Sequence, residues 1–208
     1  VRVDHVKFNG WNNGYRLTVV WAANIFGVFD HITWIGGFGN FIEIDHSSYL
    51  GIGSYGDNSW AQPTGFGTGN ALFIEDSTFT NTGIDPQAIW DCNGDGCRYV
   101  IRHNTFSHYA GSHHGTETPG RSRGGRQFEV YDNTFTSNGA GGVGIDSAML
   151  IRSGTGLFYN NTLNAINNPS PAFNMGIKLW IVRGDSNVGG WGTCDGSGSW
   201  DKNDGVVY

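Results

Sequence analysis

The chain has 208 residues, of which 34 are glycine and 38% are hydrophobic, and its formal net charge is −6. This length suits one domain with a sizeable core; the glycine content argues against a helical bundle, and the apolar content argues against disorder. The acidic balance, with three lysines among the twelve basic residues, argues against a nucleic-acid partner. No run of about twenty apolar residues occurs, so we expect no membrane span.

Six related segments recur along the chain, and each ends in an aromatic residue or leucine. They are VRVDHVKF, GVFDHITW, ALFIEDSTF, RYVIRHNTF, QFEVYDNTF and GLFYNNTL, ending at Phe8, Trp34, Phe79, Phe106, Phe135 and Leu163. An apolar residue lies five places before each end, namely Val3, Phe29, Ile74, Ile101, Val130 and Phe158. Each segment predicts a strand, a polar corner and a second strand, with asparagine supplying the left-handed backbone of the corner.

The spacing of these segments predicts a solenoid. Four of the five gaps are 26 to 29 residues long and one is 45, and extended repeats of this length are typical of stacked coils. We expect an all-β fold, a single-stranded right-handed parallel β-helix of about six to seven coils, with residues 1–208 as one domain. Further candidate strands follow most segments: RLTVVWAA, NFIEIDHSS, QAIWDCNG, SAMLIRSG and MGIKLWIVR.

Residues 50–70 break the spacing and account for the long gap. Insertions in solenoids gather on one face, often the binding face. This insertion carries Tyr55, Trp60 and Phe66, whose rings suit stacking against sugars or, alternatively, anchor the loop to the coil. We predict Trp60 as a substrate-binding residue. Residues 184–208 lose the repeat, and we expect an irregular tail or a cap over the open end of the solenoid.

The repeated segments, preceded by short strands such as AIWD, resemble the right-handed parallel β-helix of the pectate-lyase-like superfamily of carbohydrate-active proteins. GVFDHITW is similar to the VWIDHxTF segment of pectate lyases, although the lysine and arginine motifs that follow it in those enzymes are not recognisable here. The resemblance covers nearly the whole chain. It implies a carbohydrate-active protein without specifying a reaction.

Cys92 and Cys97 bracket NGDG, a spacing that allows a disulfide in an oxidising compartment, and Cys194 is left over. The chain opens inside a repeat, so we expect a mature secreted or extracellular protein, or a segment of a longer one. A metal site built on the cysteines is disfavoured, because no Cys/His cluster at zinc spacing accompanies them.

Asp91, Asn93 and Asp95 have the spacing of the start of a calcium loop. The glutamate required at the twelfth position is missing, because Arg102 stands there. An EF-hand is therefore excluded, and what remains is the expectation of a looser Ca²⁺ site at Asp91 and Asp95.

Residues 109–126, YAGSHHGTETPGRSRGGR, form the most unusual stretch. It occupies a strand position in the fourth coil, yet YAGSHHGT has poor strand propensity. Its charged and titratable candidates are His113, His114, Glu117, Arg121, Arg123 and Arg126. Either they bind carbonyls at coil edges and line a solvated turn, or they bind and act on an anionic substrate. Arginine suits a carboxylate, and histidine transfers protons near neutral pH.

We expect a groove along one sheet, built from the second strand of each coil. Its outward column would hold Asp45, Asp91, His113 or His114, Arg152, and Lys178 or Arg183, with His46 beyond Asp45. Adjacent coils are about 4.8 Å apart, so neighbouring members of the column would reach one sugar unit.

The leading hypothesis is a secreted polysaccharide lyase that cleaves an acidic glycan by β-elimination. Such a reaction needs a base beside a carboxylate and positive charge to stabilise the resulting anion. His113 or His114 would be the base, and Arg121, Arg123, Arg126 or Arg152 would neutralise the carboxylate. Substrate-binding candidates are Asp45, His46, Trp60, Asp91, Glu117 and Arg152.

Two alternatives stay open. A glycoside hydrolase would use Asp45 and Asp91 as its paired carboxylates, two coils apart, and would leave the arginines unexplained. A non-catalytic glycan-binding or structural β-helix, such as an adhesin or fibre segment, predicts that His113, His114 and the arginines point apart.

Overall fold

The computed structural model describes residues 1–11, 18–36, 40–45, 65–81, 88–92, 96–107, 111–114, 125–137, 147–152, 154–165 and 175–179. Within these ranges the secondary structure consists of β-strands, without a helix. In this part of the chain, accordingly, there is no helix that could cross a membrane.

The strands form three parallel sheets of six, which we name A, B and C. Sheet A contains β1 (Arg2–Asp4), β4 (Gly27–Asp30), β7 (Leu72–Glu75), β10 (Arg98–Arg102), β13 (Gln127–Tyr131) and β16 (Thr155–Tyr159). Sheet B contains β2 (Lys7–Trp11), β5 (Thr33–Gly36), β8 (Thr78–Asn81), β11 (Thr105–Ser107), β14 (Thr134–Ser137) and β17 (Thr162–Ala165). Sheet C contains β3 (Val20–Ala23), β6 (Ile42–Asp45), β9 (Trp90–Cys92), β12 (Gly111–His113), β15 (Ser147–Ile151) and β18 (Met175–Leu179).

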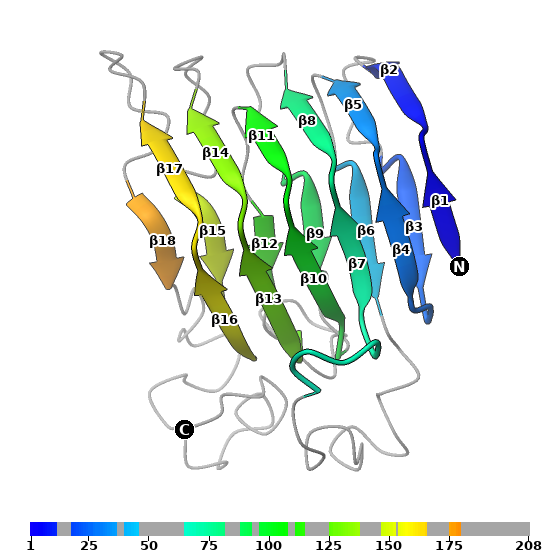
Figure 1. Ribbon diagram of the computed structural model, residues 1–208. Helices are drawn as coiled ribbons and strands as arrows, with labels where there is room; N and C mark the ends of the chain where they lie inside the picture. Colours follow the sequence, from blue (N-terminus) through cyan, green and yellow to red (C-terminus); the bar gives the residue numbers. More distant parts are fainter. Residues whose placement is uncertain are drawn as a thin grey trace, which may run out of the picture.

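The chain visits sheets A, B and C in turn, so that three consecutive strands make one coil. In the view of Figure 1 the strands of sheets A and B run upward in front, those of sheet C run downward behind, and the chain advances to the left. This path is a right-handed coil. The predicted parallel β-helix is confirmed, with six coils in the described residues.

The columns of the sequence repeat are columns of paired residues in the sheets. The apolar positions pair in register from Val3 to Phe158 in sheet A, and the terminal positions pair from Phe8 to Leu163 in sheet B. In the core, the Phe106 ring stacks on Phe79 and Phe135 at centroid distances of 5.1 and 4.9 Å. Each such pair contributes about 0.5–1.5 kcal/mol beyond burial.

The corner between sheets A and B differs from the expectation in one respect. The left-handed backbone belongs to the residue before the asparagine column: φ is between 50° and 58° at His5, His31, Asp76, His103, Asp132 and Asn160. The asparagines instead form an inward ladder. Asn104 Nδ2 donates to Asn133 Oδ1 at 3.1 Å, and Asn133 Nδ2 donates to Asn161 Oδ1 at 3.0 Å. They satisfy the polar groups of the buried corner rather than supplying its turn.

The connections from sheet C to sheet A carry the long segments of the chain. Residues 50–70 lie between β6 and β7, and residues 115–124 lie between β12 and β13. The short connection from β9 to β10 is closed by a disulfide, which the sequence spacing allowed, with the Cα atoms of Cys92 and Cys97 6.1 Å apart.

Residues 65–70 of the insertion contact the outer side of sheet A. The backbone amides of Gly65 and Gly67 donate to Gln127 Oε1 and Glu129 Oε1 at 2.9 and 3.1 Å. Phe66 is half-buried. Tyr55, Trp60 and the tail at 184–208 lie outside the described residues.

Candidate functional site

Sheet C contains the strands predicted to form the groove, in the expected order. β6, β9, β12, β15 and β18 are successive neighbours. The poor strand of the fourth coil is β12, which is only three residues long. Gly111 is required there, because a Cβ at this position would lie 1.9 Å from ring atoms of Trp90 in the preceding coil. The indole therefore explains the glycine at this position of the strand.

The register of sheet C divides the expected outward column into two. Asp91 pairs with Ser112, and that column continues through Leu150 to Lys178. Asp45, His114 and Arg152 lie two residues further along their strands and form a second column, at the carboxyl ends of the strands. Asp45 and Asp91 are thus not in one column. They lie on adjacent strands rather than two coils apart.

A chain of polar contacts crosses four neighbouring coils on this face. His114 Nε2 lies 2.9 Å from Asp91 Oδ1, and Arg152 Nη1 lies 3.0 Å from His114 Nδ1. Asn40 Nδ2 donates to the other carboxylate oxygen of Asp91 at 3.4 Å. The side chains of His114 and Asp91 are 16% and 18% exposed, so both lie partly open to solvent. The structure brings together three predicted site residues: Asp91, His114 and Arg152.

These contacts define the tautomer of His114. A guanidinium only donates hydrogen bonds, so His114 Nδ1 must accept from Arg152. The proton of the neutral imidazole then sits on Nε2, which faces the Asp91 carboxylate. Asp91 and Arg152 therefore fix the ring from opposite sides, and Nδ1 carries the lone pair.

His113 points to the opposite side of sheet C and lies in the core. It is fully buried, and its Nδ1 lies 3.0 Å from the hydroxyl oxygen of Tyr99. Burial raises the pKa of Tyr99 far above its usual range, so this hydroxyl stays protonated. The sequence offered His113 and His114 as alternative candidates for the base. A buried side chain cannot contact a polymer outside the solenoid, so His114 is the candidate that remains.

Arg126 is also buried, at 4% exposure, near Arg98. Burial, and then the positive charge of Arg98, lower the pKa of Arg126. Its backbone amide donates to the carbonyl of Cys97, which places Arg126 at the connection between sheets C and A. The other predicted site residues lie outside the described part of the chain: His46, Trp60, Asp95, Glu117, Arg121, Arg123 and Arg183.

Two outward side chains of this face were missed as site candidates. Trp21 is 70% exposed, and its Nε1 donates to Asp45 Oδ2 at 2.7 Å. Glu43 pairs in register with Trp21 on one side and with Asp91 on the other. The period-two alternation of VVWAA and FIEID, which directs both residues outward, was the available signal. The face thus carries an aromatic plane and carboxylates toward one end and His114 and Arg152 toward the other.

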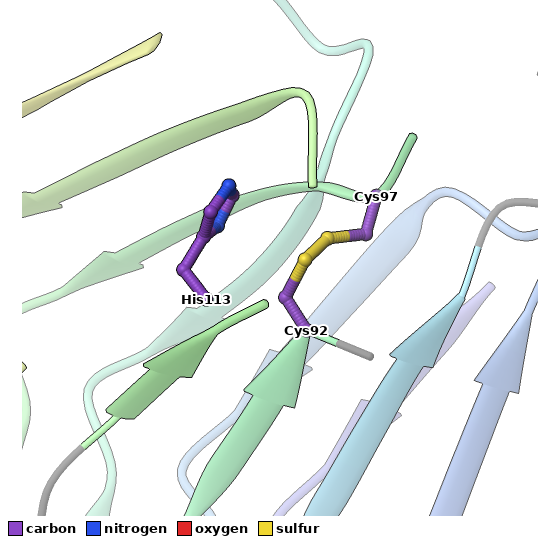
Figure 2. Close-up of side chains that lie close together, drawn as sticks. All are labelled: Cys92, Cys97 and His113. Atoms are coloured by element: carbon purple, nitrogen blue, oxygen red, sulfur yellow. A yellow bond between two sulfur atoms is a disulfide. The ribbon is translucent and has the colours of Figure 1, made fainter. Parts of the chain in front are cut away.

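A Cys/His cluster lies on the inner side of the same sheet. The sulfur atoms of Cys92 and Cys97 and one ring nitrogen of His113 are all within 4.8 Å of one another, and the three side chains are fully buried (Figure 2). The sequence did not reveal this cluster, because it forms only when β9 and β12 pair and bring His113 beside Cys92.

Asp91 does not belong to either group of potential metal ligands in the described residues. Besides the Cys/His cluster, such a group is formed by Asp30, Glu75 and Asp76. In that group Glu75 accepts from Arg102 Nε at 2.7 Å, and Asp30 forms an ion pair with Arg2. The Ca²⁺ site expected at Asp91 and Asp95 stays a prediction.

Comparisons of the chain with protein-family models, with curated proteins and with solved structures found no match. The resemblance to pectate-lyase-like proteins therefore rests on the sequence repeat and on the parallel β-helix that the repeat predicted.

Proposed function

We propose that this protein is a secreted carbohydrate-active protein and that the outer face of sheet C is a polysaccharide lyase site for an acidic glycan. The contact chain Asp91–His114–Arg152 supports this proposal, because it places an imidazole between a carboxylate and a guanidinium on the outside of neighbouring coils. The Cys92–Cys97 disulfide supports the extracellular part of the proposal, since disulfides persist in oxidising compartments.

The proposed chemistry is β-elimination at a uronate unit. Arg152 binds the uronate carboxylate, and His114 Nδ1 removes the proton from the carbon beside it. The electrons of that C–H bond form a C=C bond as the bond to the glycosidic oxygen breaks, and the leaving oxygen takes up a proton from water. In the free protein the Arg152 guanidinium donates a hydrogen bond to His114 Nδ1. A substrate carboxylate competes for the guanidinium, so that binding frees the nitrogen that acts as the base.

Trp21 extends the proposed site along the solenoid axis. It lies on β3, three strands from β12, and strands within a sheet are about 4.8 Å apart, which gives roughly 14 Å between Trp21 and His114. Its exposed indole suits stacking on a sugar ring several units away from the cleaved bond. A glycan would then run across the strands, parallel to the solenoid axis.

A Ca²⁺ ion near Asp91 and Asp95 is proposed as an additional source of positive charge at the site. Asp91 already contacts His114 and Asn40, so an ion bound there would compete with His114 for the same carboxylate. Activity that falls in the presence of a chelator would support the ion. Activity that is unchanged would remove calcium from the proposal.

The test is incubation of the chain with a panel of polyuronides while following the ultraviolet absorbance of unsaturated products. We expect His114→Ala to lower the rate by roughly 10²- to 10⁴-fold, the usual contribution of a general base. His103→Gly is the matched control, because His103 is an exposed corner histidine with φ of 58°, which glycine adopts without strain. No absorbance increase with any polyuronide, or equal loss in both variants, would overturn the lyase proposal.

A glycoside hydrolase is the second candidate, and the register of sheet C favours one version of it. Glu43 and Asp91 are directly paired on adjacent strands, which places two outward carboxylates on neighbouring coils. Closely spaced carboxylates are the requirement of retaining glycosidases. New reducing ends without ultraviolet absorbance, abolished by Glu43→Gln, would establish this alternative.

A non-catalytic glycan-binding or structural role is favoured by a different observation. His113 and His114 point to opposite sides of sheet C, and Arg126 is buried, so these members of the unusual stretch do not converge. Binding to a polyuronide that weakens in Trp21→Ala, with no product of either kind, would assign this role.

A further inference from the structure

The cluster of Cys92, Cys97 and His113 has the composition of a metal site. Cys92 ends β9, Cys97 directly precedes β10, and His113 ends β12. The ligand atoms are mutually within 4.8 Å, and no side chain of the three is exposed (Figure 2). Two thiolates and one imidazole are a donor set that suits zinc among the divalent ions.

His113 is held in the orientation that a metal ligand needs. Its Nδ1 lies 3.0 Å from the Tyr99 hydroxyl, and this second contact resembles the partner that fixes the ring of metal-binding histidines. Its Nε2 faces the cysteines: a Cβ at Gly125 would lie 2.4 Å from His113 Nε2 and 2.5 Å from Cys92 Sγ. The nitrogen and the sulfur therefore border the same point, where Gly125 leaves no side chain.

The position of His113 is otherwise an apolar one. In sheet C it pairs with Cys92 and Ile151, and Ile44 pairs with Cys92 on the far side. Burying an imidazole in such a column is unfavourable compared with an aliphatic side chain unless its nitrogens have partners. The Tyr99 hydroxyl is such a partner for Nδ1, and a bound ion would be one for Nε2.

We propose that the reduced chain binds a zinc-class divalent ion through Cys92, Cys97 and His113, and that the disulfide and the metal-bound form are mutually exclusive states of this cluster. The three side chains supply three of the four ligands of a tetrahedral ion. Because the site is fully buried, the ion enters by local opening of the chain, and slow binding is expected.

Reduction and oxidation of the two cysteines interconvert the disulfide and the metal-bound form. A phosphine reductant gives two electrons to the S–S bond, and water supplies the oxygen of the phosphine oxide and the protons of two thiols. Each thiol then loses its proton as the ion binds, so that one divalent ion releases two protons from the cysteines. In the reverse direction a small-molecule disulfide accepts two electrons from the two thiolates by thiol–disulfide exchange, which re-forms the Cys92–Cys97 bond, releases two small-molecule thiolates and expels the ion.

The experiment uses the full chain with Cys194→Ser, so that Cys92 and Cys97 are the remaining thiols. The chain is reduced with a phosphine, freed of reductant without air, and titrated with Co²⁺ while the thiolate-to-cobalt and tetrahedral d–d absorption bands are recorded. We expect one ion per reduced chain, displacement by Zn²⁺, and no bands from the oxidised chain. Tyr99→Phe keeps the ring and removes the hydroxyl, and should weaken binding about 10- to 100-fold.

The deciding comparison is between His113→Leu and His103→Gly, since φ at His103 is 58° and glycine adopts it without strain. The first removes the proposed ligand in the core, and the second changes an exposed corner histidine. A folded reduced chain without cobalt–thiolate bands, or His113→Leu binding as tightly as His103→Gly, would overturn the proposal. If reduction unfolds the chain, recovery of the β-sheet circular dichroism on addition of Zn²⁺ supports the site, and failure to recover contradicts it.

Discussion

Single contacts at the first corner of the solenoid control the ionisation of Asp4. His5 Nδ1 contacts Asp4 Oδ1, and Arg2 Nε donates to Asp4 Oδ2 at 2.8 Å. These contacts, that of His5 first, lower the pKa of Asp4 from 3.8 to about 2. Because the folded pKa is the lower one, the stabilisation from this carboxylate is present above about pH 4 and is lost as the pH falls toward 2.

We predict that His5→Gly raises the pKa of Asp4 toward 3.8. Glycine is the appropriate replacement, because φ at His5 is 55° and a Cβ is strained there. The measurement is an NMR titration of the Asp4 side-chain carboxyl group in the parent and the variant. His103→Gly is the control, since it removes an exposed corner histidine of another coil with the same left-handed backbone, φ of 58°. An Asp4 pKa that stays near 2 in His5→Gly would show that Arg2 alone lowers it.

The asparagine ladder is the element that joins neighbouring coils at the buried corner. Asn133 is 2% exposed and accepts from the backbone amide and from Nδ2 of Asn104, at 3.0 and 3.1 Å. It also donates to the carbonyl of Ile101 at 2.9 Å and to Asn161 Oδ1 at 3.0 Å. One side chain thus satisfies polar groups of three successive coils.

We predict that Asn133→Ala lowers the free energy of unfolding by about 3 kcal/mol, because each buried group left without a partner costs roughly 1–3 kcal/mol. Urea denaturation followed by circular dichroism measures the change. Thr105→Ala, on the exposed side of β11, should change the same quantity by less than about 0.5 kcal/mol. Equal effects of the two substitutions would mean that water satisfies the corner when Asn133 is removed.

The strands and their columns could be predicted because a parallel solenoid repeats the same position in every coil. Ile74, Ile101 and Val130 aligned in the sequence, and they pair in the sheet. The inward asparagine ladder was not foreseen, because one sequence column does not distinguish a left-handed residue from one that hydrogen-bonds to the backbone.

The site was less predictable, for a related reason. The residues GSH of β12 form so short a strand that its alternation cannot be read from the sequence. Only the pairing with β9 and β15 directs His113 inward and the next residue, His114, outward. The sequence indicated which strands hold Asp45 and Asp91, but not the register in which those strands pair. The prediction that the two residues share one column was therefore wrong. The Cys/His cluster depends on the same pairing and left no local signal.

At the scale of the whole molecule, each described coil is paired only with the coils before and after it. Stability in such a solenoid is approximately a sum of coil terms and interfaces between neighbours. The long segments are confined to the connections between sheets C and A, so they interrupt neither sheet B nor the corner ladder. We therefore expect that a whole coil can be removed without changing the order in which the chain visits the sheets, whereas part of a coil cannot.

We predict that the chain folds without residues 127–154, which make up β13, β14 and β15. Gln127 pairs with Thr155, so joining residue 126 to 155 brings the next coil into the vacated position. Asn161 then takes the place of Asn133, and Phe158 that of Val130, since these residues pair in the intact chain.

Because one strand of six is lost from each sheet, the urea dependence of the unfolding free energy should fall by about one sixth. Deletion of residues 127–140 is the matched control. It removes the sheet A and sheet B strands of this coil and leaves its sheet C strand, so it breaks the order in which the chain visits the sheets, and it should abolish cooperative unfolding. If the two deletions unfold alike, the coils are not independent units, and long-range contacts beyond nearest neighbours must hold the solenoid together.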